Sequence, residues 1–127
     1  MKLIIYTDGA SRGTPGPAAY GFTIQDEKGH YLHEQGEYIG ITTNNVAEYT
    51  AVLEALKHAK KLETRIKGQQ LRQVIIDVEL YADSKLVAEQ LSGRYKIKAK
   101  HLKPLISQIQ TLSIELGGIV FNHIPRY

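Results

Sequence analysis

The sequence contains no cysteine and no long run of apolar residues. Without cysteine the chain can form neither disulfides nor thiolate metal sites, so any metal would have to bind oxygen or imidazole ligands. No apolar stretch approaches the roughly 20 residues that a membrane helix requires. The N-terminal stretch is too short and too quickly acidic for a secretory signal. We therefore expect a cytoplasmic protein that makes no membrane contact.

The chain has 127 residues, the size of one domain, and we expect a single domain over 1–127. Its charge is unevenly distributed: residues 1–83 hold 9 Lys and Arg against 11 Asp and Glu, whereas residues 84–127 hold 7 against 2. The basic residues gather between Gly93 and Lys103. A polyanion such as a nucleic-acid backbone would suit this segment. A solvated basic surface explains it equally well, so charge alone does not decide the function.

The periodicity of apolar residues predicts eight secondary-structure elements. Predicted strands cover 2–8, the two arms of a hairpin within 18–40 that turns at 27–29, 73–83 and 119–125. Predicted helices cover 42–62, 84–91 and 101–118. The first strand is a continuous apolar run, which indicates burial on both of its faces. The order β-β-β-α-β-α-α-β predicts an α/β fold in which helices flank a five-stranded mixed sheet, with three antiparallel strands and two parallel ones.

Two carboxylates stand where predicted parallel strands end. Asp8 and Asp83 follow such strands, and the working crevice of an α/β sheet lies beyond their carboxyl ends. Glu48 lies near the start of the first predicted helix. Each acid also has a purely structural interpretation: Asp8 suits an Asp-Gly turn and Asp83 could cap a helix. Glu48 could form a capping box with Asn45.

Three carboxylates close together would repel one another, and a divalent cation is the usual remedy. Only oxygen ligands are available at these positions, so Mg²⁺ or Mn²⁺ is the natural ion. Two such ions about 4 Å apart can activate a water and stabilise the leaving oxygen of a phosphodiester. Residue spacing by itself indicates no more than an acidic metal site at a sheet edge.

Three segments extend this interpretation, namely YTDGASRGTPGPAAYGFTI, TTNNVAEYTAVLEAL and LYADSKLVAEQLSGRYKIK. In this order they resemble the signatures of type 1 ribonuclease H, and the closing NHIPRY resembles the run before the family's last motif. The resemblance covers essentially the whole chain and is to the compact bacterial and archaeal branch. It implies a ribonuclease H-like fold. It also implies a monomeric endonuclease that hydrolyses the RNA strand of RNA/DNA hybrids with two Mg²⁺ or Mn²⁺ ions.

The resemblance implies roles for individual residues. Asp8, Glu48 and Asp83 match the catalytic metal ligands. Further matches are substrate contacts: Gly9, Ala10 and Ser11 in a loop whose backbone the RNA approaches, Thr43 at a DNA phosphate, Asn44 and Asn45 in the minor groove, and Ser84 and Lys85 at the hybrid. Small residues let a nucleic-acid backbone come close. Helix capping explains Asn44 about as well.

The last catalytic motif of the family is only partly matched. Arg126 and His123 lie near a position that assists proton transfer or product release in the family. Arg126 matches it better, whereas a structural role is the more common one for a histidine placed like His123. The family's fourth carboxylate, an aspartate in an EN-x-x-AD stretch opening a C-terminal helix, has no match, because no acid follows Glu115. Either the sequence is a truncated piece, which the clean match up to Tyr127 favours, or the protein ends there.

Without the fourth carboxylate and the C-terminal helix, we expect an intact hybrid-binding face, weakened metal affinity and reduced or lost cleavage. The alternative is a module that binds hybrid or double-stranded RNA without efficient cleavage. A related nuclease acting on another polynucleotide also fits, because a fold does not settle the substrate.

Overall fold

The computed structural model of the protein describes residues 1–69, 74–93 and 99–124. Its elements are β1 (Lys2–Ser11), β2 (Gly16–Asp26), β3 (Tyr31–Thr42), α1 (Asn44–Gln69), β4 (Asp77–Ala82), α2 (Lys85–Leu91), the 3₁₀ helix η1 (Lys100–Leu102), α3 (Lys103–Glu115) and β5 (Ile119–His123). The predicted order of strands and α-helices is confirmed. Residues 94–98, in the middle of the predicted basic segment, lie outside the described residues.

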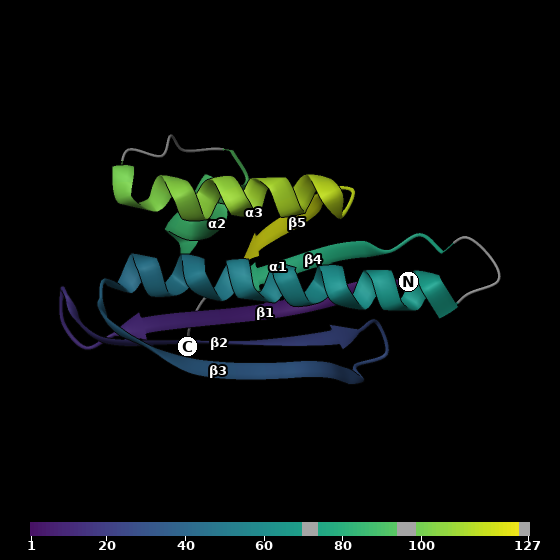
Figure 1. Cartoon of the computed structure of the whole chain (residues 1–127), viewed down its shortest axis with the longest axis horizontal. Coiled ribbons are helices and arrows are strands. Elements are labelled where there is room, and N and C mark those ends of the chain that lie inside the picture. The colour runs from purple at the N-terminus through teal and green to yellow at the C-terminus, as the bar shows by residue number, and fades with distance from the viewer. Residues whose placement is uncertain (70–73, 94–98, 125–127) are drawn as a thin grey trace.

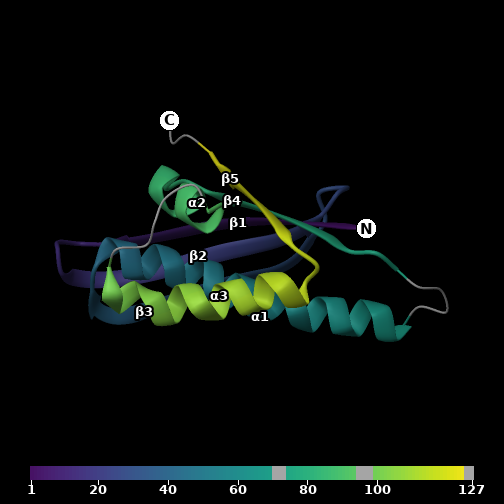
Figure 2. The same cartoon turned by 90° about the horizontal axis from the view of Figure 1, so that it is seen from above.

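The five strands form one mixed sheet in the order β3-β2-β1-β4-β5. β1, β2 and β3 are antiparallel neighbours, whereas β4 pairs in parallel with both β1 and β5, as predicted. α1 and α3 lie together on one side of the sheet, and α2 packs beside β4 and β5 (Figures 1 and 2). In the described part of the chain, no helix is both long and apolar enough to cross a membrane.

β1 is buried on one face only, contrary to the prediction of burial on both. Leu3 and Ile5 are fully buried, whereas Tyr6 is 40% exposed and Asp8 is also exposed. The reason is that α1 packs against one face of β1 and β2, and the apolar run does not reveal which faces will be covered. We call the opposite side of β1, β2 and β3, which carries Tyr6, Asp8 and Gly21, the open face of the sheet.

α1 supplies much of the core and is longer than predicted. Tyr49 and Leu56 are fully buried, as their helical spacing indicated, and burying such a side chain contributes about 1.5–3 kcal/mol. The helix continues past residue 62, so the lysines expected at its end lie in its interior. Buried Glu63 stabilises this extension, because its carboxylate lies 3.0 Å from Lys60 Nζ and 3.8 Å from Lys67 Nζ.

The other boundaries follow the local chemistry. β4 begins at Asp77 and not at residue 73 as predicted. At this first residue, the backbone N–H of Asp77 donates a hydrogen bond to the carbonyl of Met1 at 3.0 Å. Pro104 occupies the first turn of α3, and Gly117 and Gly118, which follow this helix, have positive φ. Gly29, with φ of 86°, closes the predicted turn between β2 and β3.

Two histidines stack between β3 and α1. The ring centroids of His33 and His58 are 4.0 Å apart and the rings are inclined by 18°. Burial lowers the pKa of His58 below its ordinary value, and the neighbouring His33 and Lys61 lower the pKa further. Glu54 and Glu37 act in the opposite direction and do not cancel these effects. The lowered pKa favours the neutral form of His58.

This stack predicts a pH-dependent stability. The folded-state pKa of His58 is depressed, so its contribution is complete above the unfolded-state pKa, about 6.5, and is lost as the pH falls through the folded-state value. His58→Phe retains a ring but cannot titrate. We expect urea unfolding between pH 7.5 and 5 to show a smaller loss of unfolding free energy in this variant. His101→Gln, at an exposed site on η1, should leave the loss unchanged; equal slopes in all three proteins would contradict the assignment.

Candidate active site

The register of β1 and β4 brings two carboxylates together. The parallel pairing runs from Lys2 opposite Asp77 to Thr7 opposite Ala82. Asp8 is the next residue after Thr7, and Asp83 is the next residue after Ala82. The two aspartates therefore stand side by side, just beyond the last pair of the parallel ladder. Neighbouring strands lie about 4.8 Å apart. The predicted meeting of these two residues at the carboxyl ends of adjacent strands therefore agrees with the register.

The third carboxylate comes from α1, which lies directly on β1 at Gly9. A Cβ atom at Gly9 would stand 2.4 Å from the backbone carbonyl of Ala47 and 2.6 Å from the backbone nitrogen of Glu48. Only glycine permits this approach, and it places Glu48 beside the end of β1. A single depression is consequently lined by Thr7, Asp8, Gly9, Glu48, Ala82, Asp83, Ser84 and Val87.

The structural interpretations of the two aspartates are wrong. Asp8 and Gly9 stand inside β1 and do not form a turn. The cap of α2 is Ser84, whose Oγ accepts a hydrogen bond from the backbone N–H of Val87 at 3.3 Å. Asp83 therefore does not cap that helix. Asp8 therefore lies within β1, and Asp83 stands just before the residue that caps α2.

The capping box proposed for Glu48 and Asn45 is also wrong. Thr43 precedes α1, and its Oγ1 accepts a hydrogen bond from the backbone N–H of Val46 at 3.2 Å. Glu48 instead accepts a hydrogen bond from Asn44 Nδ2 at 2.6 Å. This contact joins residues i and i+4, which share one helix face. The carboxylate of Glu48 is thereby oriented by a neighbour on its own helix.

Asn44 links the carboxylate to the end of β1. While its Nδ2 donates to Glu48, its Oδ1 accepts a hydrogen bond from the backbone N–H of Ser11 at 3.1 Å. The sequence suggested a minor-groove contact or a cap for Asn44, and not this bridge. Its spacing from Glu48 was the available signal, whereas the contact with Ser11 depends on how β1 meets α1. Asn44 is also exposed, so it lies on the surface beside the depression.

Tyr49, the neighbour of Glu48 in α1, is buried in the core and links this helix to α2. Burial first, and then the neighbouring charge of Glu48, raises the pKa of Tyr49 to about 12. The phenol therefore keeps its proton at neutral pH and donates it in a hydrogen bond to Gln90. Because Gln90 belongs to α2, this bond ties α1 to the helix that begins just after Asp83.

The remaining residues with implied roles are distributed around the depression. Gly9, Ala10 and Ser11 lie within β1 and not in a loop, because all three continue its pairing with β2. Ala10 is exposed, whereas Gly9 is buried under α1. The hydroxyls of Thr43 and Ser84 cap helices. Asn45 is half-buried and Lys85 is exposed.

Of the two residues near the family's last motif, the structure describes His123 only. His123 is the exposed last residue of β5 and pairs with Ala82, one position before Asp83. Its place in the final strand was predicted, and its role stays a prediction. Arg126 lies outside the described residues.

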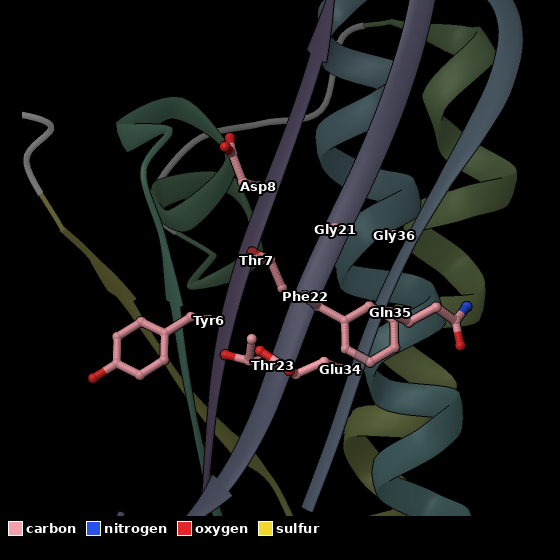
Figure 3. Close-up of a pocket in the computed structure, with 9 residues that line it drawn as sticks. All are labelled: Tyr6, Thr7, Asp8, Gly21, Phe22, Thr23, Glu34, Gln35 and Gly36. Carbon is pink, nitrogen blue, oxygen red and sulfur yellow. The ribbon is translucent and has the colours of Figure 1, made fainter. Parts of the chain in front are cut away.

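Asp8 also borders a hollow over the open face of the sheet (Figure 3). Asp8 is in register with Gly21 of β2, which is in register with Gly36 of β3. The two glycines leave the floor beside the carboxylate without side chains. Figure 3 shows Asp8 at one end of the hollow, with Tyr6 and Glu34 toward the other. Asp8 can thus be approached both from the depression and from the open face.

The donor chemistry of the depression fits a hard divalent ion, because three carboxylates offer oxygen alone. The side chains as placed do not converge on one point. Within residues 1–69, 74–93 and 99–124, no three acidic or histidine side chains form a group that could hold a metal ion. Buried Glu48 is oriented by Asn44, whereas Asp8 is exposed and Asp83 half-buried. Convergence would therefore depend on movement of the two aspartates.

Known proteins share this mixed sheet, which here has acidic residues at the ends of its central strands, and they identify the class to which the chain belongs. A family model described as reverse transcriptase-like matches residues 6–127. The structure is also similar to LC11-RNase H1, isolated from compost by a metagenomic approach. It has a TM-score of 0.86 and 44% identity to that protein, and the match covers 98% of this chain and 85% of the other. The chain therefore belongs to the ribonuclease H family.

Curated relatives agree with this assignment. The chain is 39% identical over 127 residues to the Bifunctional protein Rv2228c of Mycobacterium tuberculosis, covering 99% of this chain and 32% of that protein. It is 36% identical over 125 residues to Ribonuclease HI of Halobacterium salinarum, covering 98% of this chain and 57% of that protein. The chain thus spans about a third and somewhat over half of these two relatives. LC11-RNase H1 has also been solved in complex with an RNA/DNA hybrid.

Gly9→Ala should disrupt the site through its backbone. The added methyl group would overlap the backbone of Ala47 and Glu48, and overpacking of this kind costs about 1–3 kcal/mol. We expect urea unfolding to show a loss of this size. Gly36→Ala is the matched control, because a Cβ there would lie 3.6 Å from the carbonyl oxygen of Tyr20, an ordinary contact. Equal stability of the Gly9 and Gly36 variants would contradict the close seating of α1 on β1.

Proposed function

We propose that this chain is an endonuclease that hydrolyses the RNA strand of RNA/DNA hybrids. The observation that carries the proposal is the placement of Asp8, Glu48 and Asp83 around one depression, where β1, β4 and α1 meet. Asp8 lies within β1, and the residues that cap α1 and α2 are Thr43 and Ser84. Membership of the ribonuclease H family supports the choice of reaction, and the hybrid complex of LC11-RNase H1 supports the choice of substrate.

Asp8, Glu48 and Asp83 would hold Mg²⁺ or Mn²⁺, with two ions expected. Such ions, when bound, activate the attacking water and stabilise the leaving oxygen of the phosphodiester. Glu48 contributes a carboxylate that Asn44 has already oriented. Asp8 and Asp83 contribute carboxylates nearer the solvent, where rotation of their side chains can complete the site.

The surface beside the depression supplies the contacts for a hybrid. Exposed Ala10 leaves room for a nucleic-acid backbone, and exposed Asn44 can meet base edges or sugar hydroxyls. Exposed Lys85 stands two residues after Asp83 and can meet a phosphate. Such a grip is electrostatic, so binding should weaken as salt rises. The protein would act as a monomer, and its lack of cysteine suits the reducing cytoplasm.

The proposal predicts cleavage that depends on Asp8. An RNA/DNA hybrid labelled at the RNA end is incubated with the chain in Mg²⁺ and then in Mn²⁺. We expect RNA fragments and an intact DNA strand. Asp8→Asn should reduce the rate by about 100-fold or more, the order expected when one essential electrostatic group is removed. Hybrid binding should persist, because the substitution removes no positive charge.

Two outcomes of this experiment contradict the proposed reaction. Cleavage of DNA as readily as RNA would contradict the substrate. Tight hybrid binding without cleavage in either metal would favour the binding module over the nuclease. Cleavage that Asp8→Asn abolishes would mean that three carboxylates suffice for the reaction.

Metal binding can be tested without turnover. A ligand that binds only the folded state raises stability by mass action, by about 2.7 kcal/mol at 100 times its Kd. We therefore expect Mn²⁺ to raise the Tm of the unmodified chain in a thermal scan. Glu48→Gln and Asp83→Asn should each reduce this rise, while Glu89→Gln, in α2 but outside the lining of the depression, serves as the acidic control. A rise of equal size in all four proteins would place the ion elsewhere.

A further inference from the structure

A second hollow lies at the end of β1, beyond the depression that holds the carboxylates. It is lined by Ala10, Ser11, Arg12, Pro17, Ala18, Ala19 and Tyr38. Figure 1 shows why these residues meet: the end of β1, the beginning of β2 and the end of β3 lie together at one end of the sheet. We call this the Tyr38 hollow. None of the roles assigned above uses Arg12 or Tyr38.

The floor of the Tyr38 hollow consists of small side chains on the open face of the sheet. Ala10 is in register with Ala19, and Ala19 is in register with Tyr38. Tyr38 therefore stands at the edge of a row that is otherwise alanine. Its side chain is 66% exposed, and Ile41, farther along β3, is 65% exposed. An aromatic ring of this exposure beside a flat apolar floor is available to stack on a planar group.

Arg12 adds a positive charge from a rigid turn. Its backbone N–H donates to the carbonyl of Pro17 at 2.8 Å, and its own carbonyl would lie 1.7 Å from a Cβ at Gly16, so only glycine fits there. Ser11 Oγ donates to the carbonyl of Gly13 at 2.7 Å within the same turn. These contacts hold the backbone of Arg12 at the hollow. An exposed aromatic side chain and an exposed arginine at one hollow are a combination that suits unpaired nucleotides, by base stacking and phosphate pairing.

The Tyr38 hollow is continuous with the proposed hybrid-binding surface. Ala10 and Ser11 line it, and Ser11 is hydrogen-bonded to Asn44, which orients Glu48. From Asp8, the row containing Tyr38 is two residues along β1 and two strands across the sheet. Strand geometry makes this about 12 Å, a distance that about three or four nucleotides of a helical strand would span. A strand leaving the depression can therefore reach Tyr38.

We propose that the Tyr38 hollow binds the first unpaired nucleotides of a single strand that extends from the hybrid. Tyr38 stacks on a base, and Arg12 pairs with a phosphate. A paired base inside the hybrid offers only its edge, so the contact requires unpaired nucleotides. This inference rests on the proposed function and adds a preference for hybrids with a single-stranded extension near the cleavage site.

The test compares affinities for blunt and extended hybrids. Asp8→Asn is used as the parent protein so that the substrate stays intact, and binding is measured by fluorescence anisotropy. One hybrid is blunt, and four others carry five unpaired nucleotides at the 5′ or 3′ end of the RNA or the DNA. We expect at least one extension to lower the Kd by about 5-fold or more, the lower end of what stacking one base on an aromatic side chain contributes. The four arms show which strand reaches the hollow.

The ratio of blunt to extended Kd separates binding from stability. Adding Tyr38→Ala should bring the ratio to about 1, while Tyr38→Phe should retain it, because stacking needs the ring and not the hydroxyl. Adding Arg12→Gln should lower the ratio. It should also reduce the slope of log ratio against log salt concentration by about 0.7, the value for one phosphate of a single strand. A variant that was merely less stable would bind both hybrids less well and leave the ratio intact.

The chain offers matched controls for both side chains. Tyr31 is 65% exposed at the other end of β3, and Tyr31→Ala should leave the ratio unchanged. Arg65 is exposed on α1, so Arg65→Gln is the control for Arg12→Gln and should also leave the ratio unchanged. If the blunt hybrid binds but no extension improves the affinity, or if Tyr38→Ala retains the gain, the hollow has another role while the proposed function stands. If the blunt hybrid does not bind, the proposed function fails and this inference fails with it.

Discussion

The close contact between α1 and β1 at Gly9 is the constraint on which the site depends. The backbone of Ala47 and Glu48 occupies the space where any other residue would carry a Cβ atom. A helix seated this closely brings its first turns level with the end of β1. Glu48 therefore lines the same depression as the two aspartates although it is remote from them in the chain. Buried Tyr49, hydrogen-bonded to Gln90 of α2, holds the same part of α1 from the other side.

Parallel pairing supplies the second condition. β4 runs beside β1 in register up to Thr7 and Ala82, and the next residue of each segment is an aspartate. A shift of one residue would move every side chain of one strand to the other face and separate the two carboxylates. The core side chains Leu3, Ile5 and Leu80, all buried under the helices, oppose such a shift. The hydrophobic core thus maintains the geometry of a polar site at its edge.

Neutral side chains cap the two helices that begin beside the site. Thr43 caps α1 and Ser84 caps α2. Asn44 performs a further task with its amide, because it can accept from Ser11 and donate to Glu48 at once. Ser11 also lines the Tyr38 hollow, so this contact lies between the depression and that hollow.

The order of the elements, the mixed sheet and the three acidic positions could be read from the sequence, because apolar periodicity and glycine turns are local signals. Local patterns could not show that β1 is covered on one face only, since an apolar run looks the same whether one or both faces are buried. They also could not separate an Asp8 turn from an Asp8 within a strand, or a cap at Asp83 from one at Ser84. The bridge through Asn44, and the hollow that both Arg12 and Tyr38 line, bring together segments distant in the chain. Only tertiary structure decides such contacts, because strand register and helix seating are set by packing across the whole core and not by any single segment.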